Sequence, residues 1–460
     1  MRSRRSLLRV LLLTLAVGAV PGLLPSPASA GPRPGAVRWA RAPVIAGGTI
    51  EEWSLAKAGA DGRLFVAGVQ GQDPDDFYTG QIRIACYGAN GSVLWSRDWR
   101  GVGIAATPQG LAVDRRGAVY LLATDLYGLG PQWPSDVAVT KYSAAGVYRW
   151  TRWLGDDVHL ENRGVDLEVD GAGNAYVAAA VTTPGQDLDI AVLKLTTAGE
   201  VRYRTMYEGL LMDSPTGLAL DGGKNAYVSG FAATPTGFRP LLIKVAPSGT
   251  RRWVRRLDPL YGACMGVQAR AGAVYVAGQD GAPDRIFCAK YSPAGDQEWL
   301  RTWDSGSGSQ WAEGLAVDSR GGAYVIGHAV TMDPTPFVGG FVVRWSRGGV
   351  LRWSRYGTEL YGRLGADPHV VLVAPGDRVY VGAHVYDPGS GDLDVLVSRY
   401  TTGGERIWNR RWDGADHRWD DCSALAYRKR AGSTAVLYAT GSAHGRGPTE
   451  QDPLVLRLQP

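Results

Sequence analysis

The chain has 460 residues, and its 49 Lys and Arg against 44 Asp and Glu give a formal net charge of +5. Four of the arginines fall within residues 1–30, and without that segment the net charge is +1. A chain this close to neutral offers no electrostatic basis for binding nucleic acid or an anionic membrane, so we expect neither partner.

Residues 1–30 predict a signal peptide. A basic start is followed by an apolar run at 10–20 and by the small-residue site Ala28-Ser29-Ala30. No later run reaches the roughly 18 apolar residues that a membrane span needs. We therefore expect a secreted or extracytoplasmic protein with no membrane span. The segment 3–9 also resembles the twin-arginine export motif, whose substrates are exported folded, and ordinary unfolded export is the alternative.

From residue 35 onward one short pattern occurs eight times: a glycine, three residues, an aromatic residue, one residue and then usually arginine. The aromatic residues are Trp39, Trp95, Trp150, Tyr203, Trp253, Trp299, Trp353 and Trp408. The first copy has no repeat unit before it, and the last unit, which ends at Pro460, has no copy after it. We therefore predict that residues 36–42 form a strand that completes the C-terminal unit and closes a ring.

Three further strands precede this pattern in each unit. An apolar stretch ends in Asp, a glycine turn follows, and an aromatic-Val strand comes next, as in residues 110–120. After a variable loop, a third strand often begins with an acid, as in residues 136–142. The aromatic residues of the second strands lie 48 to 58 residues apart. Four short strands per unit at this period are typical of a propeller blade.

We therefore predict an all-β fold, a β-propeller of eight four-stranded blades, with seven blades as the alternative. A signal peptide at 1–30 would precede a single domain at 31–460. The expected blades span about 46–100, 101–155, 156–208, 209–257, 258–304, 305–357, 358–413, and 414–460 together with the strand at 36–42.

The unit has the pattern apolar-Val-Asp-x-x-Gly-x-x-Tyr-Val, then Asp and Lys, then Gly and Trp. It resembles the SBBP repeats of bacterial secreted β-propeller proteins. Its first half is similar to NHL repeats, and its second half is similar to the tryptophan motifs of quinoproteins. The resemblance covers residues 35–460 and implies a propeller, although it implies seven blades rather than the eight counted. It implies no single function, because proteins of many kinds carry such repeats.

The residues that recur in every unit predict packing rather than chemistry. The aromatic residue and the Arg of the fourth strand are two positions apart, so they share one face and can fill the space between blades. The Asp of the first hairpin, such as Asp114, is expected to accept hydrogen bonds from its own turn. The basic residue that ends the third strand, such as Lys141, is expected to pair with this Asp.

Function is expected where the units differ, in the loops at the face where the first strands begin, around the mouth of the central channel. Aromatic candidates for ligand stacking are Trp53, Trp311 and Trp419 at the starts of first strands, and Trp133, Tyr261 and Tyr361 in loops. Packing between first strands is the alternative explanation for these side chains.

Three histidines suggest a metal site or an acid–base pair. His328 and His384 occupy the same repeat position in adjacent blades, and His444 lies near that position in the next blade. The acids considered near them are Asp333, Asp387 and Asp392. Solvated loop histidines are the alternative. No cofactor is predicted, and a metal stays open. The acidic loops 73–76 and 413–421 suggest calcium.

The four cysteines, Cys86, Cys264, Cys288 and Cys422, have no paired spacing, so disulfides and buried thiols both stay open. No nucleophile motif, HExxH motif or phosphate loop is present, and no catalytic residue is assigned. Our leading hypothesis is an exported, non-catalytic, monomeric propeller that binds a protein or a glycan through its top-face loops. The alternatives are a propeller enzyme, such as a lyase, glycosidase or cofactor-dependent oxidoreductase, and a purely structural assembly platform.

Overall fold

The structure is a computed structural model. It describes residues 33–41, 52–59, 61–71, 80–128, 134–155, 161–182, 187–281, 284–306, 308–331, 337–361, 365–387, 391–414, 417–428, 435–444 and 451–460. All strands belong to one compact unit, Pro34–Pro460. The predicted signal peptide lies outside the described residues. In the described part of the chain, no helix combines the length and the apolar character needed to cross a membrane.

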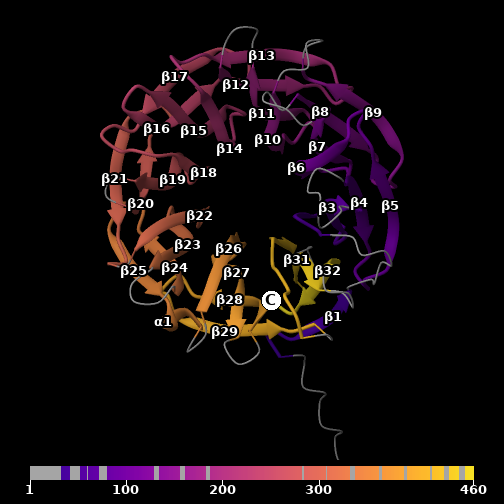
Figure 1. Ribbon diagram of the computed structural model, residues 1–460, viewed down its shortest axis with the longest axis vertical. Coiled ribbons are helices and arrows are strands. Elements are labelled where there is room, and N and C mark those ends of the chain that lie inside the picture. The colour runs from indigo at the N-terminus through magenta and orange to yellow at the C-terminus, as the bar shows by residue number, and fades with distance from the viewer. Residues whose placement is uncertain are drawn as a thin grey trace, which may run out of the picture. The chain divides into compact units, whose positions relative to one another are not determined.

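The unit Pro34–Pro460 consists of eight four-stranded antiparallel sheets around a central axis (Figure 1). The predicted all-β propeller with eight blades is confirmed. The blades are: blade 1, β2 (Leu55–Ala58), β3 (Leu64–Gln70), β4 (Gln81–Tyr87) and β5 (Val93–Trp99); blade 2, β6 (Ala105–Val113), β7 (Val119–Leu126), β8 (Ser135–Tyr142) and β9 (Tyr148–Trp153); blade 3, β10 (Asn162–Val169), β11 (Ala175–Thr182), β12 (Leu188–Leu195) and β13 (Val201–Tyr207); blade 4, β14 (Asp213–Leu220), β15 (Ala226–Thr234), β16 (Gly237–Val245) and β17 (Arg251–Arg256); blade 5, β18 (Cys264–Arg270), β19 (Ala273–Gly281), β20 (Asp284–Tyr291) and β21 (Gln297–Trp303); blade 6, β22 (Ser309–Val317), β23 (Ala323–Thr331), β24 (Phe337–Trp345) and β25 (Leu351–Tyr356), followed by α1 (Thr358–Tyr361); blade 7, β26 (Gly365–Ala374), β27 (Arg378–Asp387), β28 (Asp392–Tyr400) and β29 (Arg406–Trp412); and blade 8, β30 (Ala424–Arg428), β31 (Val436–His444), β32 (Gln451–Leu458) and β1 (Val37–Arg41).

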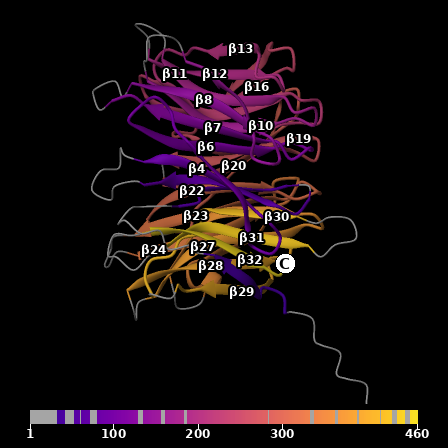
Figure 2. The ribbon, with the colours of Figure 1, turned by 90° about the vertical axis from the view of Figure 1, so that its right-hand side faces the viewer.

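The first strand of each blade is the innermost one. Each inner strand contacts the inner strands of both neighbouring blades, and β30 contacts β2, so the inner strands form a closed circle. Figure 2 shows the sheets from the side, with β30, β31 and β32 lying next to one another. The apolar residues of adjacent sheets pack between the blades, which explains why the aromatic-Val strands are almost fully buried.

The ring is closed by the two ends of the chain. β1 pairs antiparallel with β32, and Val37 lies opposite Leu458. The Gly35 N–H donates to the Gln459 carbonyl at 2.7 Å, and the Gln459 N–H donates to the Ala36 carbonyl at 3.0 Å. These two bonds replace the covalent turn that joins the third and fourth strands elsewhere. The N-terminal strand therefore completes blade 8, as the repeat pattern predicts.

The repeated Gly and Trp form one contact at every blade interface. A Cβ added to Gly146 would lie 2.5 Å from the Trp95 ring of the preceding blade, and the φ of Gly146 is +73°. The Trp95 indole donates to the Ala144 carbonyl at 3.2 Å, and Arg97 Nε donates to the Gly146 carbonyl at 2.8 Å. The predicted packing role of this pattern is confirmed. The glycine is needed both for its backbone conformation and for the space that the ring occupies.

The Asp of the first hairpin also has its predicted role. One oxygen of Asp114 accepts the backbone N–H groups of Arg116 and Ala118 at 2.8 and 2.9 Å. The predicted pairing of this Asp with the basic residue of the third strand is confirmed in blade 6, where Arg344 lies 3.1 Å from Asp318. In blade 2, Lys141 lies over the Tyr120 ring and donates to a carbonyl of blade 3, so this lysine links two blades.

All four cysteines are buried and free, which is the buried-thiol alternative. Burial raises the pKa of the Cys86 and Cys264 thiols to about 12. A thiol with such a pKa stays protonated at neutral pH and is a poor nucleophile and metal ligand.

Replacement of Gly146 by Ala is expected to lower the free energy of unfolding by about 2–4 kcal/mol, because the methyl group meets the Trp95 ring in a strained backbone conformation. Gly62→Ala is the matched control, since Gly62 has φ +85° and nothing within 4 Å of the added Cβ. The control should lose only about 1–2 kcal/mol. Equal losses in urea denaturation would contradict the proposed role of the inter-blade contact.

Candidate functional site

The inner strands of blades 2 to 7 each contain a β-bulge near their start. Each register shift leaves one residue unpaired, namely Gln109, Val165, Thr216, Met265, Glu313 and His369. A bulge changes the direction in which side chains point. It also shifts, by one position, the partner-strand residue opposite each residue that precedes the bulge. In blades 6 and 7 this shift places Trp311 opposite His328 and Asp367 opposite His384.

Eight side chains of blades 6 to 8 form what we call the inner-strand cluster: Trp311, Glu313, His328, Asp367, His369, His384, Asp421 and Ser423. Most come from the first halves of β22 and β26 and from their β23 and β27 partners, close to the ring axis (Figure 1). The titratable side chains are partly exposed, between 17% and 39%. A ligand in solution can therefore reach them.

One end of the cluster is centred on His328. Its Nδ1 lies 3.0 Å from Asp367 Oδ1 and 3.6 Å from Glu313 Oε1. The Trp311 ring stacks on the imidazole, with the ring centroids 5.5 Å apart and the planes at 28°. The Trp311 side chain is thus supported on one face while 37% of the residue stays exposed.

The other end is centred on His384. Its Nδ1 lies 2.9 Å from His369 Nε2 and 3.3 Å from Asp421 Oδ1. Asp367 Oδ2 lies 3.9 Å from His369 Nε2 and 3.8 Å from His384 Nε2. The Ser423 hydroxyl donates to Asp421 Oδ2 at 3.0 Å. The two ends are joined through Asp367.

In the cluster, carboxylates stabilise the charged form of an imidazole, and imidazoles stabilise the charged form of the carboxylates. The hydrogen bond to Asp367 raises the pKa of His328. Burial alone would raise the pKa of Asp367 and Asp421, but hydrogen bonds to His328 and His384, respectively, hold both below their usual range. Burial and the charge of Asp421 raise the pKa of nearby Glu52. Both aspartates are therefore ionised at neutral pH and keep their oxygens available as acceptors.

The predicted aromatic ligands separate into two groups. Trp311 belongs to the cluster, and Trp419, 58% exposed, lies two residues before Asp421. Trp53 is only 3% exposed and packs edge-on against Tyr87, so for Trp53 the structure supports the packing alternative and corrects the expectation of an exposed ring.

The remaining aromatic candidates are not part of the cluster as described. Tyr261, in blade 5, is 38% exposed, and the Arg239 guanidinium lies 3.6 Å from its ring centroid. Trp133 and the side chain of Tyr361 lie outside the described part of the structure.

The predicted histidine set is brought together only in part. His328 and His384 meet through Asp367, whereas His444 is outside this group and its backbone N–H donates to Asp420 at 3.3 Å. The third histidine is His369, which the repeat alignment does not single out. Of the acids considered, Asp333 and the side chain of Asp387 lie outside the described residues.

A second acidic group contains Asp392, Asp394 and Asp413, close to the loop considered for calcium. Arg411 forms an ion pair with Asp394 and neutralises part of its charge. The other loop considered for calcium, 73–76, lies outside the described residues. The arginine already serves as the cation of this second group, so the three carboxylates are not a preformed site for calcium.

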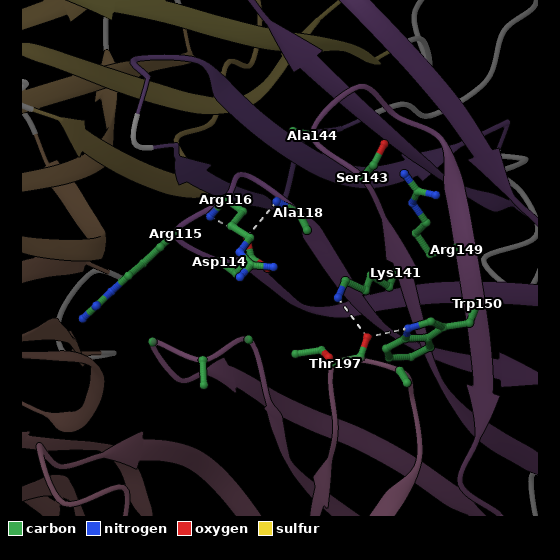
Figure 3. Close-up of a pocket in the computed structure, with 14 residues that line it drawn as sticks. Asp114, Arg115, Arg116, Ala118, Lys141, Ser143, Ala144, Arg149, Trp150 and Thr197 are labelled. Atoms are coloured by element: carbon green, nitrogen blue, oxygen red, sulfur yellow. Dashed lines mark hydrogen bonds between the residues drawn. The ribbon is translucent and has the colours of Figure 1, made fainter.

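A groove of about 890 Å³ lies on the opposite face, along the hairpin turns of blades 2 and 3 (Figure 3). Figure 3 shows Lys141 and Trp150 both donating to the Thr197 carbonyl, at 2.9 and 3.0 Å. These contacts are the same inter-blade links that other interfaces use. The groove is therefore a consequence of blade packing, and we place the candidate site in the inner-strand cluster.

Fold and site together define an eight-bladed β-propeller with a histidine–carboxylate cluster on its inner strands. No family model matches the chain, and no curated protein matches it. Among solved structures, polysaccharide lyase Uly1 is 12% identical, with a TM-score of 0.49 over 89% of this chain and 98% of that one. YCF48 bound to a D1 peptide is 10% identical, with a TM-score of 0.46 over 82% and 100%. The Pan2 WD40 domain of Neurospora crassa is 7% identical, with a TM-score of 0.43 over 77% and 89%. Similarity at this level gives no information about function.

Proposed function

We propose that this protein is an extracytoplasmic glycan-binding propeller and that the inner-strand cluster, together with Trp419, is its binding site. The observation that carries the proposal is the exposed Trp311 indole, stacked on His328 within a partly exposed group of carboxylates and imidazoles. Trp419, also exposed, precedes Asp421 of this group by two residues in the chain. Signal-like residues 1–30 support an extracytoplasmic location.

Glycan binding requires two kinds of surface in the same place. Sugar rings have apolar C–H faces that stack on indoles, and their hydroxyl groups donate to carboxylates and exchange hydrogen bonds with imidazoles. The cluster offers both. His328 fixes Trp311 from behind, so little side-chain entropy is lost when a ligand stacks on the free face.

The contacts support binding more than covalent catalysis. Ser423 donates its proton to Asp421, so no histidine of the cluster accepts it and the hydroxyl is not activated as a nucleophile. A lyase that uses acid–base chemistry is the second candidate, because a carboxylate oxygen of Asp367 lies 3.0 Å from the imidazole Nδ1 of His328 within the site. Release of new sugar ends from a bound polysaccharide would favour the lyase.

Replacement of Trp311 or of Trp419 by Ala is expected to weaken binding of a glycan identified on an array by about tenfold or more, equivalent to about 1.4 kcal/mol. Tyr148→Ala is the control, because Tyr148 is 57% exposed on β9 of blade 2, outside the cluster. Calorimetry with the purified glycan gives the dissociation constants. Unchanged binding by both Trp variants would place the site elsewhere, and capture of a protein with no glycan bound would refute the glycan proposal.

A further inference from the structure

The inner-strand cluster contains a set of atoms that suits a metal ion. Asp367, His369 and His384 each offer a ligand atom, and these atoms all lie within 4.8 Å of one another. We propose that these three side chains bind one divalent first-row transition-metal ion, such as zinc. Asp421, whose Oδ1 lies 3.3 Å from His384 Nδ1, is a neighbour of this set and not a member of it. This inference does not depend on glycan binding.

His384 Nδ1 faces both His369 Nε2, at 2.9 Å, and Asp421 Oδ1, at 3.3 Å. A neutral imidazole nitrogen either donates one hydrogen or accepts one. A cation beside His384 and His369 would bind a lone pair of each imidazole, and the nearby Asp421 carboxylate would offset part of its charge.

The spacing fits such an ion. Metal–imidazole bonds are about 2.0–2.1 Å long, so two bound nitrogens lie roughly 2.9 Å apart in octahedral and roughly 3.3 Å apart in tetrahedral coordination. The distance of 2.9 Å between His369 Nε2 and His384 Nδ1 equals the octahedral value, and a small rotation of either ring reaches the tetrahedral one. Mixed imidazole and carboxylate ligands suit zinc, iron or manganese better than calcium, which takes oxygen ligands only.

The Asp367 carboxylate is oriented from behind, as the carboxylate ligands of a metal usually are. Asp367 Oδ1 lies 3.0 Å from His328 Nδ1, which leaves Oδ2 on the side of His369 and His384. His328 is therefore a positioning residue for Asp367.

The bulge in β26 is what assembles the set. It places Asp367 opposite His384 and leaves His369 unpaired in the ladder beside them. The ligands thus come from two paired strands of blade 7. Because these strands are held on both sides by neighbouring blades, the three side chains are already close before an ion binds.

The test is zinc binding by the full purified chain after treatment with a chelator, measured by competition with a chromophoric zinc indicator. We expect one equivalent of zinc to bind, and we expect His369→Ala and His384→Ala each to weaken binding at least about 100-fold. His328→Ala is expected to weaken it about tenfold, because His328 positions Asp367. Absorption-edge spectroscopy of the zinc complex should show two imidazole ligands.

His417→Ala is the matched control. His417 is an exposed histidine whose Nδ1 lies 2.8 Å from Asp413, outside the proposed ligand set, so its loss should leave zinc affinity unchanged. The melting temperatures of the variants in chelator show whether they fold. The proposal is overturned if the wild-type chain binds no stoichiometric zinc, or if folded His369→Ala and His384→Ala variants bind it as tightly as the wild type.

Discussion

A chain that lacks residues 1–41 is expected to be destabilised by more than about 5 kcal/mol, because it loses the contacts on both sides of blade 8. On one side, the Gly35 backbone packs on the Trp408 ring and accepts a hydrogen bond from Arg410 at 2.9 Å. On the other side, the Trp39 ring packs on Gly91 of blade 1. Loss of a fully buried Trp costs about 3–5 kcal/mol, and the partly buried Trp39 contributes a share of that amount. Loss of β1 also exposes the edge of β32.

Urea denaturation of the truncated and full chains measures the difference. A synthetic peptide of residues 33–41 should raise the melting temperature of the truncated chain, because it supplies the missing strand. The same peptide with Trp39→Ala should have little effect. If the truncated chain does not fold, Trp39→Ala in the full chain provides the measurement, with Tyr148→Ala on the exposed face of β9 as the control. A truncated chain as stable as the full one would show that β1 does not close the ring.

The repeat pattern predicts the ring because every unit makes the same contact. A glycine with positive φ lies over the aromatic ring of the preceding blade in all eight copies, from Gly35 on Trp408 to Gly404 on Trp353. Where blade 3 has Tyr203 in place of Trp and Thr205 in place of Arg, the Thr205 hydroxyl donates to the Gly249 carbonyl at 2.6 Å. Such local and repeated contacts leave a clear sequence pattern, so the blade count can be read from it.

The candidate site is harder to predict because it depends on bulges, which have no sequence pattern of their own. The turn of blade 7 pairs Ala374 with Arg378, and counting outward from that pair matches His384 with Pro368. The bulge at His369 shifts the match to Asp367. The same one-residue shift in blade 6 brings Trp311, rather than Ala312, opposite His328. Repeat alignment finds His328 and His384 but not the partners that the bulges supply.

Burial of single aromatic residues is also set by neighbours that are distant in sequence. Trp53 and Trp419 both precede an inner strand, yet Trp53 is 3% exposed and Trp419 is 58% exposed. Trp53 packs with Tyr87 of its own blade and belongs to the same apolar cluster as Tyr438 of blade 8. The residues next to Trp53 in the sequence therefore do not predict that its ring is buried.

Asp213→Asn is expected to stabilise the protein at pH 8 and to have little effect at pH 4. Asp213, at the start of β14, is 0% exposed, and no side chain of the described residues donates a hydrogen bond to it, while the Gly209 backbone N–H lowers its pKa in part. Burial, followed by the charge of Asp189, raises its pKa to about 7. Burial and the charge of Glu208 raise the pKa of Asp189 as well, so the surroundings of Asp213 disfavour a further negative charge.

The sign of the effect follows from where the proton is held. Between about pH 4 and pH 7 the folded protein keeps the Asp213 proton while the unfolded chain releases it, so the free energy of unfolding falls as the pH rises. The fall ends above pH 7 and is at most on the order of 4 kcal/mol, at about 1.4 kcal/mol per pKa unit. Asn at this position has no proton to release and removes this part of the pH dependence. Urea denaturation from pH 4 to pH 8 measures it, with Asp258→Asn, whose side chain is 59% exposed, as the control. If the Asp213→Asn variant keeps the wild-type slope, Asp213 is not the buried acid responsible.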